Sequence, residues 1–207
     1  MEKKIENLPY ISKMAIANYF DKNSNTLKNS IAYWEKTDKI IRLKRGFYVF
    51  DEFLQKKDNI KYYPRFLATK MIEPSYLSME TVLQDYQMIA DVVYNYSVVT
   101  TKKTNFIKNK FGEFNYQAIK KELFKGFVEQ GYDDMKWFVA TKAKALFDFI
   151  YFNQKKFQDI SENELNGMRL NLEIMTEKDW YEYGQYTRNA SKKMNNIYEL
   201  MKKKYVS

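Results

Sequence analysis

The chain has 207 residues, a formal net charge of +9, and 45% hydrophobic and 17% aromatic residues. This composition is typical of a packed protein and excludes a disordered chain. The absence of Cys and His excludes disulfides, thiolate metal sites and cysteine nucleophiles, and it leaves a zinc site only carboxylate ligands. We therefore expect no metal ion and no cofactor.

No segment has the apolar length that a signal peptide or a membrane-spanning helix needs. The first residues read MEKKIENLPY, and no run of 18 apolar residues follows. We expect a cytoplasmic protein without a membrane partner.

The positive charge lies at the two ends of the chain. Residues 1–50 carry +5 and residues 191–207 carry +4, whereas residues 51–190 are neutral. This distribution favours a polyanionic partner for the ends and a role in packing or protein contact for the middle. The alternative is that the lysines only keep the protein soluble.

The first fifty residues predict two short helices joined by a turn. Ser12 is a candidate N-cap of the first helix, whose apolar face comprises Met14, Ala15, Ile16, Tyr19 and Phe20. The turn over residues 21–25 is rich in Asp, Asn and Ser. The second helix, from Thr26 to Lys36, places Leu27, Ile31 and Trp34 on one buried stripe.

The opposite face of this second helix is polar, with Asn25, Asn29, Ala32, Tyr33 and Lys36 outward and Lys28 on its flank. Such side chains suit base edges, because Asn pairs with adenine, Ala and Tyr pack on thymine methyls, and Lys reaches guanine or phosphate.

Residues 40–50, IIRLKRGFYVF, predict a basic hairpin with a turn at Lys44-Arg45-Gly46. Two helices followed by such a hairpin are the order of a winged helix-turn-helix, in which the second helix enters the major groove. The alternative is that the charges merely protect an edge strand from aggregation. The predicted DNA-binding residues are Asn25, Thr26, Lys28, Asn29, Tyr33, Lys36, Arg42, Lys44 and Arg45.

The charged run over residues 51–61 and Pro64 predict a connection, which gives a DNA-binding domain at 1–62 and a second domain at 63–207. A helix over residues 65–72 is expected to stop before Pro74, and Ser78 is expected to cap a helix that runs to Ile89. Short alternating segments predict a small sheet over residues 92–139. The expected fold class is α+β, a winged helix-turn-helix followed by a mixed α/β domain with a small sheet and several helices.

Three more helices are expected in the last third of the chain. The first covers residues 142–157, and capping boxes at Ser161 with Glu164 and at Thr176 with Asp179 begin the next two. The last helix has an apolar stripe formed by Tyr186, Ala190, Met194, Ile197 and Met201. Its lysines at 192, 193 and 202–204 suit the helix dipole, and the alternative is that they hold nucleic acid.

The sequence gives no sign of catalysis. Glu164 and Asp179 stand where helix caps need them, and Lys144 and Asp148 have the spacing of a surface ion pair. The six glycines form no phosphate-binding loop and no nucleophile elbow. We expect no catalytic residue, no metal ligand and no enzymatic activity.

Four segments in this order resemble the AbiEi-type antitoxins of type IV toxin–antitoxin systems: IIRLKRGFYVF, EPSYLSMETVLQDYQMI, SVVTTKKTNFIKNKFGEFNYQAI and ATKAKALFDFIYF. The resemblance covers about residues 8–155. It implies a winged-helix transcriptional repressor that binds its own promoter in double-stranded DNA, in a system of phage defence by abortive infection. It also implies a C-terminal domain that neutralises a cognate nucleotidyltransferase toxin without a stable complex.

The chain departs from the family at two places. The family usually has Pro-Glu ahead of Lys-Ala-Leu, where this chain has residues 141–144, TKAK, and many members have His-Gly where this chain has Gln87-Met88. A second hypothesis makes the chain a protein-interaction module that binds a toxin or effector directly. The sequence leaves open whether the chain binds DNA as a homodimer.

Overall fold

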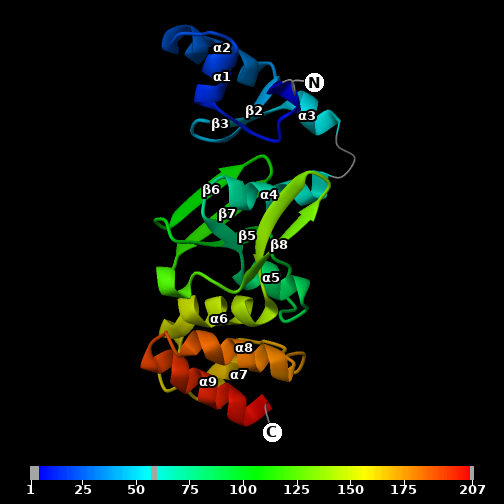
Figure 1. The fold of residues 1–207 in the computed structure, drawn as a ribbon. Helices are drawn as coiled ribbons and strands as arrows, with labels where there is room; N and C mark the ends of the chain where they lie inside the picture. The colour runs from blue at the N-terminus through cyan, green and yellow to red at the C-terminus, as the bar shows by residue number, and fades with distance from the viewer. Residues whose placement is uncertain (1–4, 57–59, 206–207) are drawn as a thin grey trace.

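The computed structural model describes residues 5–56 and 60–205, and these form a mixed α+β fold with two β-sheets (Figure 1). The chain runs from an N-terminal unit, residues 5–56, to a second unit, residues 60–205, whose last helices lie farthest from the N-terminal unit. The coarse fold class predicted from the sequence is therefore confirmed.

The N-terminal unit packs its first two α-helices on a three-stranded sheet of order β1-β3-β2. After the short 3-10 helix η1 (Ile5–Asn7), its elements are β1 (Ile11–Ser12), α1 (Lys13–Tyr19), α2 (Ser24–Lys36), β2 (Ile40–Lys44) and β3 (Phe47–Phe50). Ser12 Oγ accepts a hydrogen bond from Ala15 N at 3.1 Å, which confirms the predicted cap. Asn23 Oδ1 accepts from Thr26 N at 3.0 Å, so α2 begins two residues before the predicted Thr26.

Both helices pack on one face of this sheet. The buried cluster between them consists of Ile5, Ile11, Ile16, Leu27, Ile31, Ile40, Tyr48 and Phe50. The predicted apolar face of α1 is wrong in part, because Met14 is 73% exposed and Tyr19 is 54% exposed. A helix of seven residues is too short to bury more than one stripe, and Ile16 is its only buried residue.

The other face of the sheet joins the core of the second unit. Successive strand residues point to opposite faces, so Val49 leaves the first cluster and packs, with Leu43 and Phe53, in the same cluster as Tyr63 and Phe66. Phe53 belongs to α3 (Asp51–Gln55). The expected connection over residues 51–61 thus begins as a helix, while Lys57–Asn59 lie outside the described residues. Pro64, expected in the connection, occupies the first turn of α4 (Tyr63–Lys70).

The described part of the second unit contains a six-stranded sheet of order β6-β7-β5-β4-β9-β8. Its strands are β4 (Ser75–Leu77), β5 (Asn95–Thr100), β6 (Asn105–Asn109), β7 (Gly112–Ala118), β8 (Phe127–Tyr132) and β9 (Met135–Ala140). The sheet is larger than predicted. The central β4 lies before residue 92 and pairs antiparallel with β5 and parallel with β9. A three-residue strand carries no alternation long enough to be recognised.

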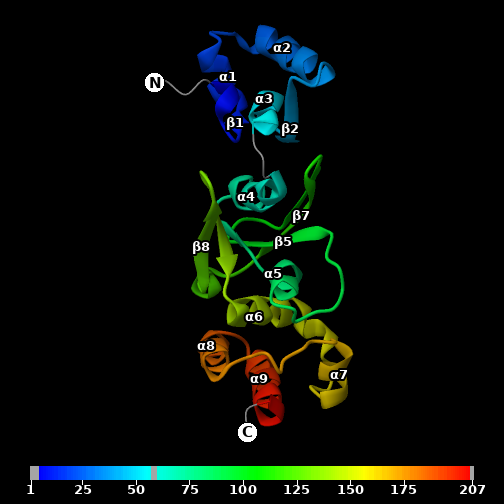
Figure 2. The same cartoon turned by 90° about the vertical axis from the view of Figure 1, so that its right-hand side faces the viewer.

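Helices cover both faces of this sheet (Figure 2). Helix α4 lies on the side of the N-terminal unit, and α5 (Met79–Asp85) and α6 (Lys142–Asn153) lie on the opposite side. Helix α5 ends four residues before the predicted Ile89. Gln87, in the pair that departs from the antitoxin pattern, has φ +58°, and Met88 is buried where the chain leaves the helix.

The last third is helical, as predicted. After the 3-10 helix η4 (Gln154–Lys156) it contains α7 (Glu162–Gly167), α8 (Glu177–Thr187) and α9 (Lys192–Tyr205). Both predicted capping boxes are present, at Ser161 with Glu164 and at Thr176 with Asp179. The stripe of α9 is confirmed for Met194, Ile197 and Met201, which are fully buried, whereas Tyr186 lies in α8 and Ala190 precedes α9.

Among the described helices, each is too short or too polar to cross a bilayer.

Candidate nucleic-acid interface

The outer face of α2 is exposed along its whole length. Leu27 and Ile31 are buried against the sheet and Trp34 is half-buried, which turns the opposite side of the helix to solvent. Tyr33 is 64% exposed although its ring is large. All six predicted residues of this helix are exposed: Asn25, Thr26, Lys28, Asn29, Tyr33 and Lys36.

Two lysines next to α2 add to its positive charge, and the sequence-based prediction missed both. Lys22 Nζ and Lys39 Nζ lie 5.4 and 5.5 Å from the centre of the Trp34 ring, and Lys22 also donates to Ser30 Oγ at 2.6 Å. The Trp34 ring itself packs on Phe20 at 5.2 Å. Lys22 and Lys39 lie just outside the two ends of α2, and this position in the sequence is the signal that could have identified them.

Arg42, on β2, is bound to α2. Its Nε and Nη2 donate to Glu35 Oε1 and Oε2 at 2.7 and 2.6 Å, a bidentate pair whose hydrogen bonds raise the pKa of Arg42. This pair joins the helix to the basic hairpin, residues 40–50. Arg42 therefore has a counter-ion already, and a phosphate would have to compete with Glu35.

Lys44 points toward the second unit. Its Nζ donates a hydrogen bond to the backbone carbonyl of Met71 and lies 4.5 Å from the centre of the Phe47 ring. Burial lowers the pKa of this lysine. The structure therefore does not bring Lys44 to the outer surface with the α2 residues, because its hydrogen bond holds it at the junction of the two units.

Arg45 is exposed at the hairpin turn and makes no ion pair or hydrogen bond with the described residues. The turn itself is fixed: Gly46 adopts φ +78°, and its carbonyl accepts a hydrogen bond from Lys13 N at 2.8 Å. Of the three predicted hairpin residues, Arg45 alone is free to meet a phosphate.

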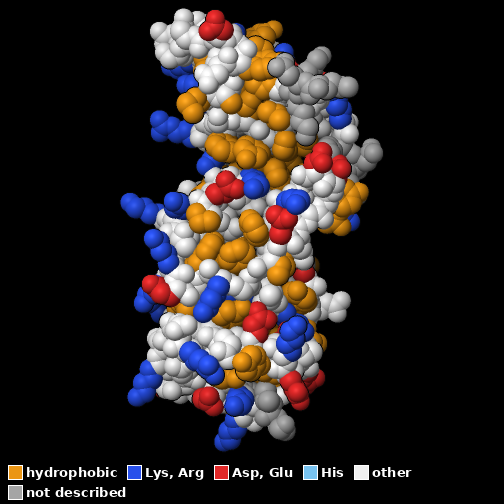
Figure 3. All heavy atoms as spheres, in the orientation of Figure 1, with side chains coloured by type: hydrophobic (Ala, Val, Ile, Leu, Met, Phe, Trp, Pro, Cys, Tyr) orange, Lys and Arg blue, Asp and Glu red, His pale blue; other side chains and the backbone are white. Residues whose placement is uncertain are grey.

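A groove of about 380 Å³ separates the hairpin from β6, the edge strand of the larger sheet. The strand contributes Phe106, which is 52% exposed, and Lys108, which pairs with Glu113 at 2.6 Å. Asn109 Nδ2 donates to the Leu43 carbonyl at 2.9 Å, and this hydrogen bond holds together the hairpin and β6, which form the two walls of the groove. In Figure 3, Lys and Arg side chains project along the left edge of the molecule, where the hairpin and β6 lie in Figure 1.

The ion pair between Lys144 and Asp148 is buried, so the predicted surface pair is wrong. Both side chains are 0% exposed and Nζ lies 2.7 Å from Asp148 Oδ1. Lys144 also donates to the Leu123 carbonyl at 2.8 Å, while Asp148 Oδ2 accepts from Tyr76 Oη at 3.0 Å and from Ser78 Oγ at 2.8 Å.

This network explains a second correction. Ser78 occupies the N-cap position of α5 but makes no capping bond, because its hydroxyl is committed to Asp148. Burial lowers the pKa of Lys144 and raises that of Asp148, and the attraction between the two opposes both shifts. A sealed pair has no access to a substrate, so its role is to join α6 to β4 and to the start of α5.

Acidic side chains elsewhere in the second unit serve as caps or lie in turns. Glu164 and Asp179 cap α7 and α8, and Asp133 adopts φ +56° in the turn between β8 and β9. Within residues 5–56 and 60–205, no three acidic side chains come together as a metal site requires.

Comparison with known proteins does not identify a family for this chain. The chain matches no protein-family model, and no curated protein matches it significantly. The resemblance to the AbiEi-type antitoxins stays a prediction from the motif order.

Proposed function

We propose that the N-terminal unit is a winged helix-turn-helix and that the chain is a DNA-binding transcriptional repressor. The observation that carries the proposal is the exposed polar face of α2, which the pair between Arg42 and Glu35 ties to the basic hairpin. In this arrangement α2 enters the major groove and Arg45 contacts the sugar-phosphate backbone. Because Lys44 is bound to Met71, we assign it to the junction of the units and not to DNA.

The side chains of α2 divide by role. Asn25 and Asn29 have the amide geometry that pairs with adenine, and Tyr33 offers an exposed ring to thymine methyl groups. Lys28 and Lys36, with Thr26 at the start of the helix, supply contacts to phosphate or guanine. Base contacts specify the sequence, whereas phosphate contacts fix the register of the protein on the duplex.

The motif order extends the proposal to a biological system. We propose an antitoxin of the AbiEi type that represses its own operon and neutralises a cognate nucleotidyltransferase toxin. Double-stranded DNA of its own promoter is then the first partner, and the toxin is a functional partner. The two activities belong to different units, so variants of α2 should leave neutralisation of the toxin intact.

The test measures binding of the full chain to DNA from upstream of its own gene by fluorescence anisotropy at several salt concentrations. Arg45→Ala should weaken binding to every sequence and lower the slope of log affinity against log salt by about 0.9. Asn29→Ala should cost about 1–3 kcal/mol on the operator alone. The matched control is Lys178→Ala, an exposed lysine of α8.

Equal affinities and slopes for the Arg45, Asn29 and Lys178 variants would contradict the DNA-binding assignment. Loss of binding with Lys178→Ala but not with Arg45→Ala would place the nucleic-acid surface on the C-terminal helices.

A second candidate function, a protein-interaction module, rests on the opposite edge of the sheet. There β8 is an edge strand with Val128 50% exposed, and Phe138 of its neighbour β9 is 38% exposed. The unpaired backbone groups of an exposed edge strand are a template for pairing with another chain. Co-elution with the product of the adjacent gene, abolished by Val128→Lys, would favour this function, and two separate species in size-exclusion chromatography would argue against it.

A further inference from the structure

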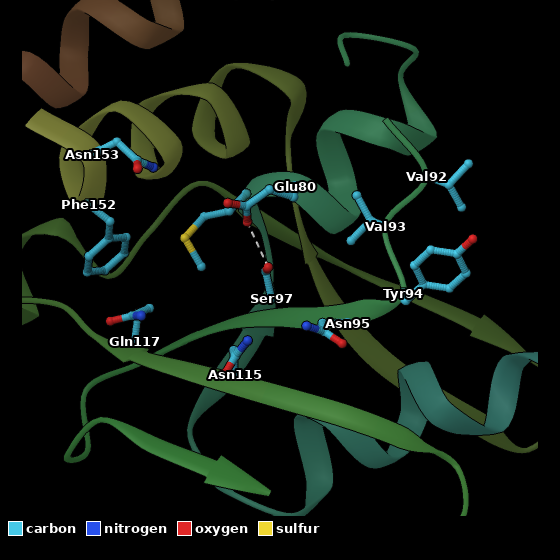
Figure 4. Close-up of a pocket in the computed structure, with 11 residues that line it drawn as sticks. Glu80, Val92, Val93, Tyr94, Asn95, Ser97, Asn115, Gln117, Phe152 and Asn153 are labelled. Carbon is cyan, nitrogen blue, oxygen red and sulfur yellow. Dashed lines mark hydrogen bonds between the residues drawn. The ribbon is translucent and has the colours of Figure 1, made fainter. Parts of the chain in front are cut away.

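A pocket of about 500 Å³ lies between helices α5 and α6 and the polar face of strands β5 and β7 (Figure 4). In the figure, Phe152 and Gln117 face each other at one end, and Val92, Val93 and Tyr94 lie at the other end. Glu80 and Ser97 stand between them, with Asn95 and Asn115 on the strands. The volume falls in the usual range for small-molecule sites, about 300–1,000 Å³.

The strands under this pocket break the usual pattern of a covered sheet. β5 and β7 pair in parallel with Ser97 opposite Asn115 and Val99 opposite Gln117. Phe114 and Tyr116 alternate with these polar residues and are fully buried on the other face. A sheet face beneath helices is normally apolar, and departures from that pattern are expected at functional sites.

Three of the four side-chain amides that line the pocket are unused, whereas Asn153 Nδ2 donates to the Phe149 carbonyl at 2.9 Å. The side chains of Asn95, Asn115 and Gln117 make no hydrogen bond with the described residues, although all three are partly buried. Glu80, by contrast, is held in place, because its Oε2 accepts from Ser97 Oγ at 2.8 Å. Three unused amides and one fixed carboxylate therefore face the same space.

The charge of the lining restricts the ligand. Glu80 is the only charged side chain among the described residues that line the pocket, although the chain has 35 Lys and Arg. A phosphate or carboxylate inside the pocket would meet a negative group and no cation. The ligand is therefore uncharged or cationic where it is enclosed, and it presents both donors and acceptors.

We propose that this pocket binds a nucleobase, either free or as a nucleoside. Asn and Gln side chains pair with the edges of bases, and a carboxylate accepts from an exocyclic amino group. Phe152, and Tyr94 with its 84% exposed side chain, supply rings on which a base can stack. None of the lining residues belongs to α2, to the hairpin or to β6, so the site is separate from the proposed DNA interface.

The experiment titrates the full chain with adenosine, guanosine, cytidine and uridine by isothermal titration calorimetry. At least one nucleoside should bind saturably with a Kd of about 1 mM or below. Ribose alone at the same concentration should not bind. Absence of binding by all four nucleosides overturns the proposal, and so does binding of ribose with the affinity of the best nucleoside.

Two pocket variants and one control locate the binding. Asn115→Ala and Gln117→Ala should each weaken the best nucleoside at least tenfold, and Asn105→Ala on β6, in the same sheet but outside the pocket, should leave it unchanged. In the unmodified protein, the side-chain amide NMR signals of Asn115 and Gln117 should shift during the titration. Unshifted signals, or equal affinities in all three variants, would place any binding elsewhere and refute the site.

Discussion

The two units each contain an ion pair with short contacts, and the pairs differ in their environment. Arg42 and Glu35 meet at 2.6 Å on the surface, with side chains 55% and 24% exposed. Lys144 and Asp148 meet at 2.7 Å in the core, with both side chains 0% exposed. Water can replace the first interaction but has no access to the second. The surface pair can therefore exchange partners, whereas the buried pair is fixed to the fold.

The largest expected effect comes from breaking the buried pair. Asp148→Ala should lower the free energy of unfolding by about 3–5 kcal/mol, because it leaves the Lys144 ammonium without its counter-ion in the core. Urea unfolding measures the change. The control is Lys136→Ala, which breaks an exposed pair with Glu129 and should cost at most about 1 kcal/mol.

The double variant Lys144→Met/Asp148→Leu sharpens this test, since it removes both charges and should be more stable than Asp148→Ala alone. Equal losses in the Asp148 and Lys136 variants would mean that the pair is not desolvated.

An intermediate effect on stability is expected at Asp179 in the cap of α8. Its side chain is more exposed than that of Asp148 and less exposed than that of Arg42. Burial alone would raise the pKa of Asp179, but hydrogen bonds from Lys142 and Thr176 outweigh it and hold the pKa below its usual range. An unfolded aspartate titrates near pH 4, at about 3.9. The stability from Asp179 is therefore complete above that pH and is lost as the pH falls through the folded pKa.

Asp179→Asn should cost about 1 kcal/mol at neutral pH and should make the stability of the protein less sensitive to acid below about pH 4. Thermal unfolding across the acid range measures both effects. Glu177→Gln, an exposed carboxylate in the same turn, is the control. An acid response in Asp179→Asn identical to that of the unmodified chain would count against the assigned shift.

The smallest effect on stability is expected at the surface pair. Glu35→Gln should change the free energy of unfolding by less than about 1 kcal/mol. It should, however, release Arg42 for phosphate and steepen the salt dependence of the proposed DNA binding by about 0.9 in the log–log slope. Asp38→Asn removes a nearby exposed charge without freeing Arg42 and should leave the slope nearly unchanged. Identical slopes for both variants would show that Arg42 is not within reach of DNA.

Local signals in the sequence predicted the local structure well. The caps at Ser12, Ser161 and Thr176 depend on contacts three residues apart, and all three are present. The exposure of Asn29 and Tyr33 followed from helical periodicity and the buried stripe at Leu27 and Ile31.

Tertiary contacts decided what the sequence could not predict. Lys144 and Asp148 have the same spacing as a surface pair. Contacts with Tyr76 and Ser78, which are far away in the sequence, place this pair in the core. The direction of Lys44 depends on Met71, which is 27 residues away. Ser97 and Asn115 belong to one pocket because β5 and β7 pair in parallel, a register that no local pattern specifies.

Leu43 and Val49 are almost completely shielded from water, and their neighbours in the core belong to the second unit. A fragment that stopped after the hairpin and α3 would present this apolar surface to solvent, and such surfaces promote aggregation. The sheet that carries the proposed recognition helix α2 therefore shares a core with the second unit. Because β6 and α4 contact the hairpin, we expect a change that shifts either element to displace the surface proposed to bind a duplex.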